Sequence, residues 1–137
     1  TLVTAAEVYA MNDCGQRIDL TIPSGREYAL VASMALSAMG VLAGLDVELL
    51  GDLQTVASEC LDCLNHQAGR PGQITLEAWL NRKRLFVTFQ SQNRQEGQQP
   101  DTLALEITRG VLETLMPDVR LLCDQSGVYR IECSMPV

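Results

Sequence analysis

Basic residues are scarce in this sequence, and the shortage is uneven along the chain. Lysine and arginine together number 10 against 17 aspartates and glutamates, which gives a formal net charge of -7. Between Glu27 and Gly69 there is no lysine or arginine at all. A nucleic-acid binder needs a basic face to neutralise phosphates, so we expect no nucleic-acid partner. Disorder is excluded as well, because apolar residues make up 47% and charged residues only 20% of the chain.

The sequence also lacks the ligand pairs that a structural metal site requires. Cys60, Cys63 and His66, the only histidine, could lie along one helix face, but three ligands in a row make a poor tetrahedron. No second pair follows, so we predict no metal site. The cysteines form an odd set in a chain with a substantial core, which indicates mostly buried, reduced thiols in a cytoplasmic protein. They are Cys14, Cys60, Cys63, Cys123 and Cys133.

Residues 28–45 carry no charge, and their length is at the lower limit for crossing a bilayer. Alanine, serine and glycine fill half of this run, and neither an aromatic belt nor a basic cluster flanks it. We therefore expect no membrane span. An apolar helix outside a membrane packs between other layers of the protein, so we predict burial on both sides. Small residues at four-residue spacing, Ser33 with Ser37 and Gly40 with Gly44, would let a neighbour approach closely.

Hydrophobic periodicity and turn residues predict elements in the order β-β-α-α-β-β-α-β-β. The predicted strands cover residues 4–11, 16–22, 74–80, 85–89, 119–123 and 128–133, and the predicted helices cover 25–44, 46–67 and 102–116. In the last helix we expect an inward stripe of Ala104, Ile107, Val111 and Leu115.

Strands grouped in hairpins with helices between them predict an α+β fold. We expect a two-layer sandwich, in which about three helices cover one face of a mixed, mostly antiparallel sheet. A chain of 137 residues has the length of one domain, so we assign residues 1–137 to a single unit. The strand predicted at 4–11 would be an extra N-terminal strand of that unit.

Three stretches of the sequence carry a family resemblance. Residues 18–45 form a predicted strand ending in Ile-Pro-Ser, followed by the apolar helix. Residues 52–59 run from Asp-Leu to Ala-Ser-Glu, and residues 112–119 read Leu-Glu-Thr-Leu-Met-Pro-Asp-Val. In these stretches and in its element order the chain resembles the anti-sigma-factor serine kinases, bacterial regulators of the GHKL ATPase superfamily. The resemblance covers nearly the whole chain and implies a histidine-kinase-like ATPase fold and a role in transcription regulation.

The resemblance implies a nucleotide site on the helix predicted for residues 46–67. In the family a glutamate there activates the attacking hydroxyl, and an asparagine four residues later, about one helical turn, holds magnesium. Glu59 stands at the glutamate position and would be the catalytic residue of an active enzyme. Cys63 stands at the asparagine position, where a thiol is a poor ligand for magnesium. Asn65 does not replace it, because two residues further on it points roughly the other way.

The remaining parts of the family's nucleotide site are also altered. After the strand at 85–89 the family has an Asp-x-Gly-x-Gly turn that reads adenine, but residues 90–94 contain no carboxylate and no glycine. The family's lid and glycine-rich phosphate turn are reduced to a short segment with the single glycine Gly97. Asp101, at or beside the cap of the next helix, would take up free N–H donors and repel a phosphate. Glu59, Cys63 and Asp101 therefore form the remnant of a nucleotide pocket, and we expect no bound ATP.

The leading hypothesis is thus a regulatory protein-binding module that resembles anti-sigma factors and needs no cofactor. By resemblance its partner is a sigma factor or an antagonist protein, and the domain pairs as a homodimer. Two alternatives stay open. One is an active ATP-dependent serine protein kinase with a rebuilt site and Mg-ATP as its cofactor. The other is a small-ligand sensor that reuses the vacated pocket, with Glu59 and Cys63 lining it.

Several polar residues also have purely structural interpretations. Glu59 without a nucleotide would be a solvated or paired carboxylate, and His66 would cap its helix or lie on the surface. The basic run of residues 82–84 is interpreted as a solvated hairpin tip, with a docking patch for an acidic partner as the alternative.

Overall fold

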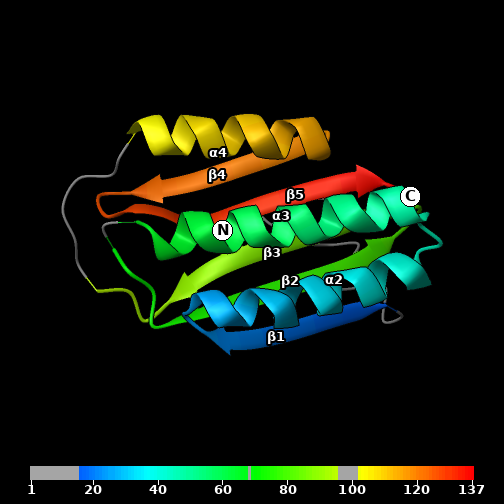
Figure 1. The fold of residues 1–137 in the computed structure, drawn as a ribbon, viewed down its shortest axis with the longest axis horizontal. Coiled ribbons are helices and arrows are strands. Elements are labelled where there is room, and N and C mark those ends of the chain that lie inside the picture. Colours follow the sequence, from blue (N-terminus) through cyan, green and yellow to red (C-terminus); the bar gives the residue numbers. More distant parts are fainter. Residues whose placement is uncertain (1–15, 68, 96–101) are drawn as a thin grey trace.

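The computed structural model describes residues 16–67, 69–95 and 102–137. In these residues five strands form one sheet, and three α-helices lie on one of its faces (Figure 1). The strands are β1 (Arg17–Pro23), β2 (Gln73–Asn81), β3 (Arg84–Gln92), β4 (Asp118–Asp124) and β5 (Gly127–Pro136). The helices are the short 3-10 turn η1 (Arg26–Tyr28), α2 (Ala29–Leu42), α3 (Val47–Asn65) and α4 (Thr102–Leu115). The strand predicted at 4–11 and the cysteine Cys14 lie outside the described residues.

The sheet has the strand order β1-β2-β3-β5-β4, and every neighbouring pair is antiparallel. The predicted α+β architecture with helices on one face is therefore confirmed. The sheet is not mixed in the described part of the chain, because its strands come from two hairpins and β1 pairs antiparallel with β2. Alternation places Ile74, Leu76 and Ala78 of β2 in the core beneath the helices.

The helix α3 lies between α2 and α4 over the middle of the sheet (Figure 1). It begins at the predicted position because the Asp46 side chain accepts a hydrogen bond from the Leu49 backbone N–H at 2.9 Å. Because it has a neighbour on each side and the sheet below, α3 buries a wide face of Leu53, Val56, Ala57, Cys60, Leu61, Cys63 and Leu64. This helix therefore carries most of the helical contribution to the core.

The prediction that the apolar helix is buried on both sides is wrong. The outer face of α2 is open, and its exposed fractions are 65% at Leu30, 63% at Met34, 62% at Val41 and 65% at Leu42. The reason is position, because α2 is the outermost helix on the β1 side, and among the described α-helices only α3 packs against it (Figure 1). Among the described helices none combines the length and the apolarity needed to cross a membrane.

The small residues of α2 do allow a close approach, but only at one of the two predicted glycines. A Cβ atom added at Gly40 would lie 2.5 Å from Cδ2 of Leu50 and 2.9 Å from Cδ1 of Leu53, so α3 packs directly on the α2 backbone there. Gly44 has nothing within 4 Å of such a Cβ and a φ of +80°. Gly44 instead lets the chain leave the end of α2 with a positive φ, a conformation that glycine adopts easily.

The helix α4 also differs from its predicted orientation. Ile107, predicted to face inward, is 60% exposed, whereas Leu112 is fully buried. Leu105 and Leu115 pack against the core from the same side as Leu112. The sequence of α4 offers two overlapping apolar stripes, and the one that packs against the core contains Leu105, Leu112 and Leu115. The side chain of Ala104 lies outside the described part of the structure.

Candidate functional site

The predicted nucleotide-site residues Glu59 and Cys63 lie one turn apart on α3, as their spacing requires. Glu59 is half-buried, whereas Cys63 is only 6% exposed. The third residue of the predicted remnant, Asp101, lies outside the described residues. The structure therefore places two of the three on one helix face and leaves the third undescribed.

The Cys63 thiol is enclosed between α3 and α4. Its pKa is raised to about 11. Burial is the largest cause, a hydrogen bond with the Thr108 side chain of α4 works in the opposite direction, and the charges of Cys123 and Glu59 add to the rise. A thiol with this pKa is protonated at neutral pH, the weakly reactive form of a buried structural cysteine. The contact with Thr108 also means that α4 packs directly against α3 beside Cys63.

We expect the burial of Cys63 to make stability depend on pH at the alkaline end. The unfolded thiol ionises near its ordinary value of 9.0, but the folded one keeps its proton to about 11, so the native state binds more protons in this interval. Stability is therefore lost as the pH rises from about 9 to about 11, by up to roughly 2–3 kcal/mol. Denaturant unfolding of the wild type and Cys63→Ala at pH 8 and pH 11 measures this loss as a difference. The exposed Cys123→Ala is the matched control, and an equal pH dependence of the two variants would contradict the assignment.

The cysteines that the structure describes are free thiols. Cys60, Cys63 and Cys133 are buried and Cys123 is exposed, which agrees with the prediction of mostly buried, reduced thiols. Burial is the main cause that raises the Cys60 pKa, and a hydrogen bond with Cys133 adds to it. Within residues 16–67, 69–95 and 102–137 no three histidine, cysteine or acidic side chains are grouped closely enough to hold a metal ion.

Asn65 and His66 line a hollow of about 260 Å³ at the C-terminal end of α3. His66 caps the helix, since its Nδ1 lies 2.7 Å from the backbone oxygen of Asp62. Arg26 and Arg70 line the same hollow. Neither Glu59 nor Cys63 does, so the structure does not bring these polar groups together with the predicted remnant.

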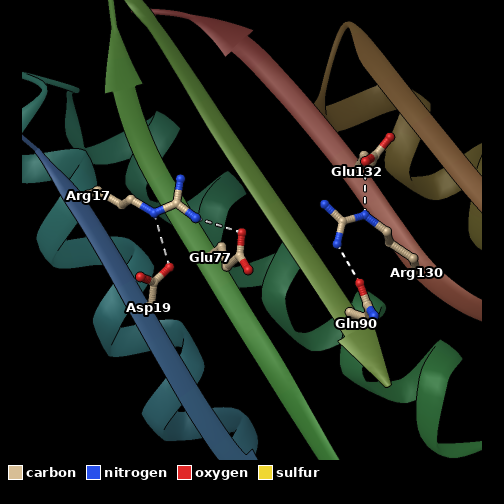
Figure 2. Close-up of polar contacts among 6 residues, drawn as sticks. All are labelled: Arg17, Asp19, Glu77, Gln90, Arg130 and Glu132. Atoms are coloured by element: carbon tan, nitrogen blue, oxygen red, sulfur yellow. Dashed lines mark hydrogen bonds and ion pairs between the residues drawn. The ribbon is translucent and has the colours of Figure 1, made fainter. Parts of the chain in front are cut away.

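The sheet face opposite the helices carries charged side chains that satisfy one another. Arg17 donates to Asp19 at 3.2 Å and to Glu77 at 2.9 Å, and Arg130 donates to Glu132 at 2.9 Å and to Gln90, as Figure 2 shows. Beside this network, Trp79 stacks on Phe86 with a centroid distance of 5.3 Å, and Arg17 lies over the Trp79 ring. The charged groups of this network are therefore paired locally, whereas Nε1 of Trp79 is buried without a hydrogen-bond partner.

The residues that the sequence analysis missed are those on the outer face of α2. Leu30, Met34, Ala38 and Leu42 follow one another at four-residue spacing and form a solvent-facing ridge, with Val31 and Val41 beside it. We call these six residues the α2 face. A signal existed in the sequence, because the inner stripe of Ala32, Leu36 and Met39 and this ridge lie on opposite sides of one helical wheel. What the sequence did not reveal is that, within the part of the chain that the structure describes, only the inner stripe packs into the core.

A second hollow of about 430 Å³ opens where the α2 face ends. It is lined by apolar residues of α2 and β2, Leu42, Ala43 and Leu80, and by the basic β2–β3 turn residues Arg82 and Lys83, which we call its rim. Gln16, Asn81 and Val137 complete the lining. We call this hollow the tip groove. It joins an exposed apolar surface to basic side chains, a combination that suits a protein segment with both apolar and acidic residues.

No protein-family model matches this chain, and no curated protein matches it either.

Proposed function

We propose that the protein is a regulatory protein-binding module that resembles anti-sigma factors and does not bind ATP. The observation that carries this proposal is the α2 face, a row of large apolar side chains that are 62–65% exposed at four positions, with no charge among them. Continuous apolar surface of this kind on a domain that already has a core is typical of a protein–protein interface.

The environment of Cys63 supports the second half of the proposal. The family position that would hold magnesium is a protonated, buried thiol in contact with Thr108 of α4. Magnesium requires oxygen ligands and keeps much of its hydration, which this position offers no room for. The anti-sigma resemblance supplies the class of partner, a sigma factor or its antagonist, and the histidine-kinase-like fold as the finer description of this α+β domain.

We expect thermal unfolding to be unchanged by Mg-ATP or Mg-ADP. A nucleotide present at about 100 times its Kd would stabilise the native state by about 2.7 kcal/mol and raise the Tm by several degrees. Differential scanning fluorimetry of the wild type and of Glu59→Ala makes the comparison, with Glu48→Ala as a control at an exposed acidic position of the same helix.

A Tm increase that is lost in Glu59→Ala but kept in Glu48→Ala would contradict the proposal and favour the kinase alternative. A Tm increase that both variants keep would show that a nucleotide does bind, and would therefore also contradict the proposal. It would place the nucleotide away from Glu59.

A further inference from the structure

We propose that the tip groove anchors an acidic segment of the partner, with an apolar side chain in the hollow and an adjacent carboxylate on the basic turn. This inference rests on the proposed function and names the chemistry by which the partner is recognised. Three observations support it: the apolar lining, the charge of the rim and the backbone conformation of the turn.

The apolar lining of the tip groove continues the α2 face. Leu42 belongs to both surfaces and is exposed, and Leu80 lines the hollow and packs against the core. The volume of about 430 Å³ exceeds that of one large side chain, so a partner helix lying along α2 has space to place an apolar residue here.

The rim is basic in a chain that is otherwise acidic. The net charge is -7, and α2 and α3 contain no lysine or arginine. Of the three successive basic residues, Arg84 already pairs with Asp118 and with the Ser134 hydroxyl. Lys83 makes no ion pair within the described residues, and its side chain is exposed at the groove. A carboxylate that approaches from the α2 side therefore meets an available ammonium group.

The turn that presents these side chains is strained. Arg82 has a φ of +47° and Lys83 a φ of +66°, in a two-residue hairpin that asparagine followed by glycine would form most easily. Residues held at such angles are strained, and they cluster at functional sites. We infer that the turn keeps its basic side chains for recognition.

An acidic protein segment fits these observations better than the other candidates. In a dimer formed through the α2 faces of two copies of the chain, uncharged surfaces would contact each other. The basic rim would then contribute nothing to the contact. Two cationic side chains in a chain of charge -7 are too few to neutralise a nucleic-acid backbone.

The test uses two synthetic amphipathic helical peptides with the same leucine stripe, one ending in two glutamates and the other in two lysines. Each labelled peptide is titrated with the full chain and followed by fluorescence anisotropy. We expect the acidic peptide to bind about tenfold more tightly than the basic one at low salt, and this preference to shrink as salt rises.

Substitutions at the turn separate recognition from structure. The double variant Arg82→Asn/Lys83→Gly is expected to lose most of the preference for the acidic peptide while its Tm rises by a few degrees, because the strain is relieved. Lys83→Arg is expected to keep the preference, since it keeps the charge. Leu42→Ser is expected to lower the affinity for both peptides equally, because it removes part of the apolar lining.

Equal affinity for the two peptides, or a preference that survives the double variant, would overturn this inference. So would self-association of the wild type, measured by light scattering, if the double variant abolished it. The proposed function fails separately. If a sigma factor or antagonist binds the double variant as tightly as the wild type but binds a variant of the α2 face weakly, the function stands and the tip-groove inference falls. If acidic peptides bind as expected and no such regulator binds, the groove stands and the proposed function falls.

Discussion

Gly127→Ala is expected to lower the free energy of unfolding by about 3 kcal/mol, because backbone strain and the loss of a buried hydrogen bond combine there. Gly127 has a φ of +105°, a conformation that L side chains rarely adopt. An added Cβ would lie 2.3 Å from Oε1 of Gln67. That oxygen accepts the backbone N–H of Val128 at 3.0 Å, so moving it leaves a buried donor unsatisfied. Backbone strain costs about 1–2 kcal/mol and the lost hydrogen bond about 1–3 kcal/mol.

The buried amide of Gln67 explains why this glycine matters to the fold. Its Nε2 donates a hydrogen bond to the Cys63 carbonyl oxygen at 2.8 Å, and its Oε1 accepts one from the backbone N–H of Val128. One side chain therefore joins the end of α3 to the start of β5. Displacing it therefore weakens both ends of the connection.

Gly44→Ala is the matched control for this prediction. Gly44 also has a positive φ, +80°, but an added Cβ would have nothing within 4 Å. Only the backbone cost remains, and we expect about 1 kcal/mol. Denaturant unfolding measures both variants. Equal losses at the two glycines would contradict the role of Gln67. In the double variant Gly127→Ala/Gln67→Ala the costs should be clearly less than additive, because both changes remove the same hydrogen bond.

The fold could be predicted where periodicity is strict. Alternation in β1 and β2 set which residues face the core, and the helix predicted for residues 46–67 begins at Asp46, which the structure shows to be the cap of α3. The hydrogen bond between Gln67 and Val128 could not be predicted, since it joins residues 61 apart and leaves no local pattern. The prediction of which face of α4 points inward was wrong for a different reason. Two apolar stripes overlap on this helix, and contacts with α3 and β4 decide which of them is buried.

The candidate site was predictable in its spacing but not in its surroundings. Glu59 and Cys63 share a face of α3 because they are one turn apart, and this follows from the sequence alone. Whether that face is open depends on where α4 packs, which is a property of the whole chain. The α2 face was missed because a helix that is apolar all round gives the same pattern whether it has one partner or two.

Met34→Glu is expected to weaken partner binding by about 30-fold or more, equivalent to about 2 kcal/mol, while leaving stability within about 0.5 kcal/mol of the wild type. Met34 lies in the middle of the α2 face and is 63% exposed, so the free protein tolerates a carboxylate there. In a complex the same carboxylate would be removed from water without a partner. The measurement is a titration of the labelled protein with purified sigma factors and their antagonists from the same organism, together with denaturant unfolding.

Ile107→Glu provides the matched control, because Ile107 is also a large, exposed apolar residue and the change adds the same charge. It lies on α4, which α3 separates from α2 (Figure 1). A general effect of added negative charge would weaken binding equally in the two variants. If the partner binds the α2 face, binding is weakened only in Met34→Glu. Equal affinities of both variants and the wild type would contradict the assigned surface, and a wild type that binds none of these regulators would contradict the proposed function itself. Selective loss in Met34→Glu with unchanged unfolding would establish that the exposed apolar ridge serves binding, since a contribution to the fold would have appeared in the free energy of unfolding.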